Sequence, residues 1–396
     1  MSREFELVLE CARHRWDPSA GPRIANLVQE DIDWHALLQR ARLNRVMPLV
    51  YAGLSTHAKD ALPQPVADEL RSSFRASARN GIALSGHLLQ VLHCFEQEGI
   101  QVLPFKGPAL AMGLYGDLAL RSFGDVDVLI DTQDVAKARE ALIKRGYVVG
   151  WSHSEWEFHY DAPSGGHTID VHHRIAPDHF PSPGSFQELW QRRHSVSLLN
   201  TTVSTIGHED LVLALSVELV RDYLERKPRL VQICDVAALL TRVPALDWER
   251  ILAHASAIGC HRILLLDLLL ARNLLRIELP REVGAAAAGD RSLNRLAAYA
   301  ARRLSSRVDV PSPGARLDTL FYLRTRERSK DKWRYLHYRV WSRVRPVITP
   351  TEKDSRFLAL PQSLSFLAYG VRPIRVINDY IIQRWRKPAQ PAANTD

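Results

Sequence analysis

The first hundred residues carry apolar stripes at helical spacing. One stripe begins just after Asp33, which can cap a helix that starts at Trp34. A second stripe covers residues 82–98 and ends before Gly99, a residue type that commonly follows a helix. The pattern predicts a helical region over residues 1–99.

Between residues 100 and 205 the pattern changes to short apolar runs of the kind that form β-strands. Five runs predict strands, at residues 100–105, 126–130, 147–151, 156–160 and 168–172. Helical spacing returns between some of them, at residues 108–115 and 133–145. Strands that follow helices and also pair locally predict a small sheet, in an α+β (mixed α/β) fold with helical regions on both sides of the core.

Helical periodicity resumes after residue 206 and continues to a proline-containing breaker at residues 311–314. The alanine-rich residues 284–289 are interpreted as a link between helices. The last residues are rich in proline and alanine and are predicted to be disordered. The chain thus divides into an N-terminal helical region, a sheet core, a second helical region, a basic C-terminal helical segment and a tail, at residues 1–99, 100–205, 206–310, 311–386 and 387–396.

Composition narrows the class of protein. The 396 residues carry a net charge of +8, which favours anionic partners such as nucleotides, nucleic acid or acidic lipid. The four cysteines are far apart, so neither a zinc site nor a disulfide framework is indicated, and a cytoplasmic location is expected. The N-terminus holds charges where a signal peptide needs an apolar run, and no apolar stretch approaches the roughly 18 residues of a membrane span.

Three aspartates are the most informative polar residues of the predicted core. Asp125 and Asp127 alternate along one strand, so their side chains share a face, and Asp170 lies between two β-branched residues of a later strand. Carboxylates this close repel one another unless a cation neutralises them, and Mg²⁺ prefers carboxylates together with phosphate oxygens. If the two strands are neighbours, the acids suffice for two metal ions acting at phosphorus. A plain turn or cap is the alternative for the Asp-x-Asp pair.

The loop at Lys106 and Gly107 lies between the first strand and a predicted helix. A helix N-terminus offers free N–H groups to phosphate, glycine permits close approach of the backbone, and lysine adds a cation. An ordinary strand-to-helix turn is the alternative.

Taken together, these residues resemble the polymerase-β-type nucleotidyltransferase superfamily, which pairs a glycine-led loop and helix with an acid-x-acid strand and a third acid on a later strand. The chain is more closely similar to the bacterial family of uncharacterised nucleotidyltransferases. The matching stretches are residues 103–107, 115–130, 169–172 and 229–240, with two short late ones at residues 360–361 and 372–373. The resemblance extends over about residues 33–375.

The resemblance implies a metal-dependent enzyme that moves a nucleoside monophosphate from an NTP, such as ATP, to an acceptor and releases pyrophosphate. By resemblance, Asp125, Asp127 and Asp170 are the catalytic and metal-binding residues, with Mg²⁺ or Mn²⁺ as the metal. Nucleotide binding would fall to Lys106, Gly107, Arg121 and Ser122. The acceptor stays open between a small molecule, a peptide, a protein and RNA.

Pro108 departs from the superfamily pattern, because proline has no N–H to donate to phosphate. A degenerate core acting as a nucleotide-binding scaffold or sensor is therefore the alternative. His172 shares a face with Asp170 and is expected either to orient that carboxylate, to contact the acceptor, or to be a core histidine. Three other histidines are near it in sequence, His153, His159 and His167. Their spacing fits no metal site, and most of them are expected at the surface.

Residues 321–345 form a basic segment with nine Lys or Arg residues against two acids. Four aromatic residues are interleaved, Trp333, Tyr335, Tyr338 and Trp341. Basic and aromatic residues together can bind nucleic acid by phosphate contacts and stacking, or bind an acidic membrane surface. A nucleic-acid-binding protein is thus a further alternative, and a solvated helix that packs its aromatic residues is the structural one.

Overall fold

The computed structural model describes residues 1–150, 156–163, 165–225, 227–306, 315–349 and 372. The chain divides into two compact units, Met1–Arg328 and Ser329–Asp396. The first unit holds the three regions that the sequence separates at residues 99 and 205, and their division into domains stays a prediction. The tail predicted at residues 387–396 lies outside the described residues.

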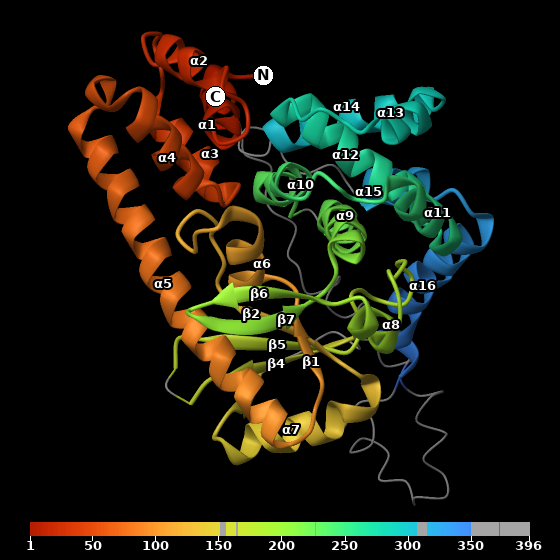
Figure 1. Ribbon diagram of the computed structural model, residues 1–396. Coiled ribbons are helices and arrows are strands. Elements are labelled where there is room, and N and C mark those ends of the chain that lie inside the picture. Colours follow the sequence, from red (N-terminus) through yellow and green to blue (C-terminus); the bar gives the residue numbers. More distant parts are fainter. Residues whose placement is uncertain (151–155, 164, 226, 307–314, 350–371, 373–396) are drawn as a thin grey trace, which may run out of the picture. The chain divides into compact units, whose positions relative to one another are not determined.

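The first unit begins with a run of helices (Figure 1). These are α1 (Arg3–Arg13), α2 (Ala20–Leu27), α3 (Trp34–Leu43), α4 (Met47–His57), the 3₁₀ turn η1 (Lys59–Ala61) and α5 (Gln64–Gln97). The Asp33 side chain caps α3 by accepting a hydrogen bond of 2.9 Å from Ala36 N, as the sequence predicts. The predicted 82–98 helix is the second half of α5, which starts at Gln64 and runs down to the sheet.

The sheet contains the five predicted strands. They are β1 (Val102–Pro104), β2 (Val126–Ile130), β3 (Val148–Val149), β4 (Glu157–Asp161) and β5 (Thr168–His172), in the order β1-β2-β5-β4-β3. Only the central pair, β2 and β5, is parallel, and its register sets Asp127 opposite Asp170. The fold is therefore a small mixed sheet with helices on both sides, which confirms the α+β prediction.

Short elements connect these strands. After β1 come α6 (Gly107–Leu110) and the π turn η2 (Ala111–Tyr115), and after β2 come η3 (Thr132–Asp134) and α7 (Val135–Lys144). Apolar residues of α5 and α7 pack against β2 and β5 in a continuous core, including Leu88, Phe95, Leu142, Val128 and Val171. Because side chains alternate along a strand, Asp127 and Asp170 project from the face of the sheet opposite to Val128 and Val171.

A second, two-stranded sheet follows α8 (Phe186–Gln191) and was not predicted. Its strands β6 (His194–Leu198) and β7 (Thr201–Thr205) are joined by Leu199 and Asn200, both at positive φ. A two-residue hairpin turn usually signals itself with glycine, and this one has none. The pair joins the main sheet through the Thr205 hydroxyl, which donates to Pro104 O.

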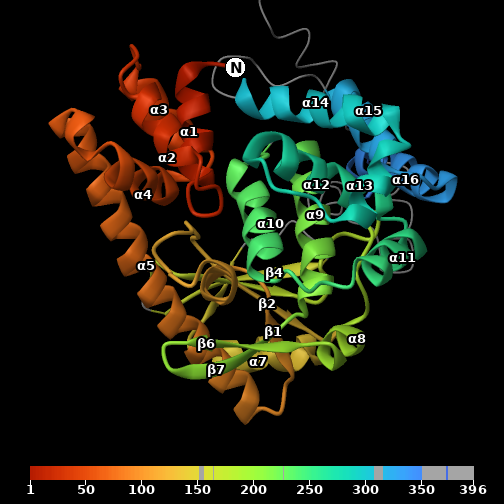
Figure 2. The same cartoon turned by 45° about the horizontal axis from the view of Figure 1, so that its top comes forward.

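The remaining helices of the first unit form a bundle on the other side of the strands from α7 (Figure 1 and Figure 2). They are α9 (His208–Leu224), α10 (Leu230–Arg242), α11 (Trp248–Ile258), α12 (His261–Leu275), α13 (Arg281–Ala288), α14 (Arg291–Ser305) and α15 (Ala315–Thr325). The interpretation of residues 284–289 as a link was wrong, because residues 284–288 belong to α13 and Gly289 is its C-cap. Alanine has the highest helix propensity, which outweighs the flanking glycines here.

In the second unit the described residues form one helix, α16 (Ser329–Ile348), which holds most of the basic segment. Trp333 and Trp341 are exposed on it. Binding of nucleic acid by this segment stays a prediction. No helix among the described residues combines the length and apolarity that a membrane crossing requires.

Candidate metal and nucleotide site

The register of β2 and β5 brings two of the three predicted carboxylates together. Asp127 and Asp170 are direct partners on adjacent parallel strands, so their side chains project from the same side of the sheet. One ligand atom from each of them and one from His172 lie within 4.8 Å of one another. Asp125 stands two residues earlier, at the entry to β2, and is not one of these three ligands.

The electrostatics of the aspartates are strongly coupled. The Asp127 charge is the largest cause that raises the pKa of Asp125 to about 6, and burial and Asp170 act in the same direction. Burial also opposes ionisation of Asp127, which is only 8% exposed, but the Lys106 charge and a His172 hydrogen bond outweigh it and hold the Asp127 pKa below its usual range. The site thus collects negative charge that its own residues only partly neutralise.

Two histidines contact these carboxylates. His172 Nε2 lies 3.0 Å from Asp127 Oδ1, its Nδ1 lies 3.4 Å from Glu157, and Phe105 and Trp156 flank its ring. His172 therefore orients Asp127. One of the alternatives drawn from the sequence was that it orients Asp170. Asp170 instead contacts His159 Nδ1.

The His159 side chain is 35% exposed, and its cross-strand pairing also places it directly opposite Asp170. His167 is half-buried beside His87, and His153 lies outside the described residues.

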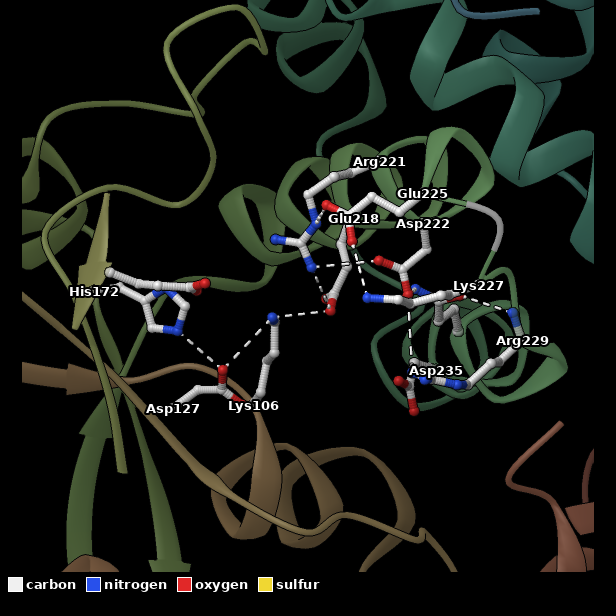
Figure 3. Close-up of polar contacts among 12 residues, drawn as sticks. Lys106, Asp127, His172, Glu218, Arg221, Asp222, Glu225, Lys227, Arg229 and Asp235 are labelled. Atoms are coloured by element: carbon white, nitrogen blue, oxygen red, sulfur yellow. Dashed lines mark hydrogen bonds and ion pairs between the residues drawn. The ribbon is translucent and has the colours of Figure 1, made fainter. Parts of the chain in front are cut away.

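Lys106 connects the sheet to the helical bundle. Its ammonium lies 2.9 Å from Glu218 Oε1 on α9 and 3.7 Å from Asp127 Oδ1, with the side chain almost buried (Figure 3). Burial opposes the charge on Lys106, but the two acids raise its pKa, so it stays protonated. The Lys106 ammonium therefore lies at the site, between the candidate metal ligand Asp127 and Glu218 of α9.

Both the backbone conformation and the surroundings of residue 107 favour glycine. Its φ is +55°, and a Cβ atom there would lie 3.1 Å from the Asp125 carbonyl oxygen. The loop therefore packs directly against the strand entry that carries Asp125. Pro108 falls in the first turn of α6, where a missing N–H costs no helical hydrogen bond.

Arg121 is occupied by a partner in the bundle. Its Nε and Nη2 each donate to Asp235 of α10 at 2.8 Å, and the Tyr115 hydroxyl donates to the same carboxylate at 2.8 Å. All three side chains are buried, so this ion pair joins α10 to the segment before β2. Ser122 is half-buried next to it. Phosphate binding by Arg121 and Ser122 stays a prediction.

The residues present fit a divalent metal ion. Carboxylate oxygens are the hard ligands that Mg²⁺ and Mn²⁺ prefer, and the mutual repulsion seen in the Asp125 pKa is the cost that such an ion removes. Asp127 and Asp170 supply the adjoining ligands, with Asp125 as the further carboxylate that the sequence predicts.

Several acids of the site were missed by sequence reasoning. Glu218 is one of several acidic residues on α9, so the sequence pattern does not single it out. Glu157 is found only through the β4–β5 pairing. Asp235 lies in the 229–240 stretch that was singled out for resemblance, and its isolation among apolar residues was the available signal.

The chain was compared with known proteins. No curated protein matches the chain. The antibiotic-resistance factor ANT(2'')-Ia is 14% identical over 55% of this chain and 95% of its own, with a TM-score of 0.28. An antigenic nucleotidyltransferase-like protein from Paracoccidioides brasiliensis is 13% identical over 51% of this chain and 95% of its own, also with a TM-score of 0.28. The profile of the family described as uncharacterised nucleotidyltransferase matches residues 30–276, which include every site residue above. The chain belongs to this nucleotidyltransferase family.

Proposed function

We propose that the protein transfers a nucleoside monophosphate from an NTP to an acceptor, with Mg²⁺ or Mn²⁺ held by Asp125, Asp127 and Asp170. The observation that carries this proposal is the in-register pairing of Asp127 with Asp170 on parallel strands, next to Asp125 and Lys106. Carboxylates concentrated in this way are costly in a folded protein unless a cation is bound.

In the proposed reaction an acceptor hydroxyl oxygen bonds to the α-phosphorus of the NTP. The bond from that phosphorus to the bridging oxygen breaks, and pyrophosphate leaves with its electron pair. Bound metal supplies charge neutralisation at the phosphates. Asp170 accepts the acceptor proton, His172 holds Asp127 in place, and Lys106 offers its charge to a phosphate after leaving Asp127.

Label transfer tests this function. Purified protein is incubated with each α-³²P-labelled NTP, Mg²⁺ and extract from the source cells, and labelled acceptor and pyrophosphate are followed. Transfer that Asp127→Asn and Asp170→Asn each abolish supports the proposal. Tight metal-dependent nucleotide binding without transfer favours the scaffold or sensor alternative, and transfer that persists in both variants contradicts the assigned residues.

A further inference from the structure

The turn between α3 and α4 docks on the start of α10 through one residue. Asn44 is buried, its side-chain oxygen accepts a hydrogen bond from Leu230 N at 3.1 Å, and its backbone oxygen accepts one from Val231 N at 3.2 Å. The next residue on one side of this contact is Arg45, and the preceding residue on the other side is Arg229. The docking therefore fixes two arginines beside each other.

Arg45 is held in an unfavourable backbone conformation. Its φ is 55°, in the left-handed region that residues with a Cβ atom adopt at a cost. Its side chain is exposed and forms no ion pair with any described residue. Packing alone does not explain why this strained turn carries an arginine without an ion-pair partner among the described residues.

The surroundings of the two arginines point toward the aspartates. Arg45 interacts electrostatically with two arginines, Arg229 and Arg121, and with two acids, Asp125 and Asp222. The Arg229 guanidinium lies 3.9 Å from the Asp222 carboxylate, a long contact, and Arg221 also lies near that carboxylate (Figure 3). Gln232 donates a hydrogen bond to the same acid. Arg45 and Arg229 thus lie close to each other near Asp125, and the acid that they share, Asp222, also contacts Arg221.

We propose that Arg45 and Arg229 form the binding site for the oligophosphate chain of the donor nucleotide, next to the aspartates. This inference rests on the proposed function and deepens it. Guanidinium groups bind phosphate oxygens in a fixed, bidentate geometry, and an anion removes the repulsion between the two arginines. Since Pro108 leaves the loop one N–H short, the helical elements on the other side of the site supply the missing positive groups.

The test uses the full chain and inorganic tripolyphosphate as the probe, with binding measured by calorimetry after metal is removed. Arg45→Gly and Arg229→Gln are each expected to weaken binding about tenfold, which corresponds to one charge-assisted contact. Glycine tolerates positive φ, so Arg45→Gly should melt no lower than the wild type while losing affinity. That divergence separates a binding role from a structural one.

A matched control is available at Arg276, which also has a φ of 56° and an exposed side chain but ends α12 beside Glu10. Arg276→Gly should bind tripolyphosphate as the wild type does. The inference is overturned if the wild type does not bind the probe, if Arg45→Gly binds it normally, or if Arg276→Gly loses as much affinity.

Mn²⁺ binding, followed by electron paramagnetic resonance in the same variants, separates this inference from the function on which it rests. Unchanged Mn²⁺ affinity in Arg45→Gly, together with weaker tripolyphosphate binding, supports the inference. Failure of the wild type to bind Mn²⁺ counts against the proposed function, whereas normal Mn²⁺ and normal tripolyphosphate binding in Arg45→Gly count against the arginine site alone.

Discussion

Each aspartate of the strand pair β2–β5 contacts different charged or titratable side chains. Asp127 is contacted by Lys106 and His172, while Asp170, directly opposite it, is contacted by His159. Neighbouring carboxylates therefore have separate supports. The Lys106 ammonium is shared by two acids, Asp127 and Glu218, and its shorter contact is to Glu218.

Lys106→Met should separate metal binding from nucleotide binding. The Lys106 ammonium lies 3.7 Å from Asp127 and repels a metal ion bound there. Because repulsion at this distance amounts to about 1–4 kcal/mol, Mn²⁺ alone is expected to bind about tenfold more tightly to Lys106→Met. Nucleotide binding should weaken, because the proposed phosphate contact is lost. Electron paramagnetic resonance measures the first quantity and calorimetry the second. The exposed Lys59 supplies a control, Lys59→Met. Weaker Mn²⁺ binding in Lys106→Met contradicts competition between the two cations.

At the scale of elements, the site depends on a loop packed against a strand entry. Gly107 meets the Asp125 carbonyl so closely that a side chain has no room, and its φ suits glycine. The loop after β1 therefore helps to set where β2 begins, and with it where Asp125 and Asp127 point.

Gly107→Ala should destabilise the fold by about 1–2 kcal/mol, from the left-handed conformation and the 3.1 Å contact. Label transfer should fall as well, because Asp125 shifts. Gly86→Ala is the matched control: Gly86 is inside α5 with open space around its Cβ position, so it should gain about 0.5–1 kcal/mol. Denaturant melts of both variants measure these differences, and equal stability of Gly107→Ala and wild type contradicts the packing described.

The sequence predicted these elements where local pattern and tertiary structure agree. Strands β1, β2 and β5 are present because their apolar runs contain buried residues, and Asp33 caps the helix that starts at Trp34. The β6–β7 hairpin lacks a glycine turn signal, and the role of Glu218 depends on where α9 lies. Pairings such as Asp170 with His159 follow from register, which a single sequence does not specify.

At the scale of the first unit, buried ion pairs connect regions that are far apart in sequence. The Arg121–Asp235 pair ties the segment before β2 to α10. Asp267, inside α12, is also fully buried, and within the described part of the chain neither of its carboxylate oxygens has a hydrogen-bond partner. The two buried acids thus have opposite effects: Asp235 forms an ion pair that connects two regions, whereas burial of Asp267 destabilises the fold.

Asp235→Asn should lower the free energy of unfolding by about 3–5 kcal/mol, because it leaves the buried Arg121 guanidinium without its counter-ion. The control is the exposed Arg71–Asp68 pair, for which Asp68→Asn should cost less than about 1 kcal/mol. Chemical denaturation at neutral pH compares the two. Similar small losses in both variants indicate that the buried pair is not a structural connection.

Asp267 should make stability depend on pH. Burial raises the pKa of Asp267 to about 8, whereas the unfolded chain ionises an aspartate near pH 4. Between these values the folded state binds one more proton, so the free energy of unfolding falls as pH rises. Asp267→Asn should remove this slope and be more stable at pH 7 by at most about 4 kcal/mol, since one pH unit corresponds to about 1.4 kcal/mol.

Denaturant melts at a series of pH values measure this difference, which should vanish below about pH 4. The exposed Asp60 gives the control variant, Asp60→Asn, whose pH dependence should follow the wild type. A difference between Asp267→Asn and wild type that stays constant from pH 4 to 8 contradicts a raised pKa.

The separate supports of Asp127 and Asp170 have a practical consequence for finding the acceptor. Because Asp170 is on its own strand and is contacted by His159, Asp170→Asn can disable proton acceptance while Asp127 keeps His172 and Lys106. Such a variant is expected to hold the donor nucleotide and the acceptor together without completing transfer. Immobilised on a resin and loaded with a nucleotide, it becomes a trap from which the unknown acceptor can be eluted and identified by mass spectrometry.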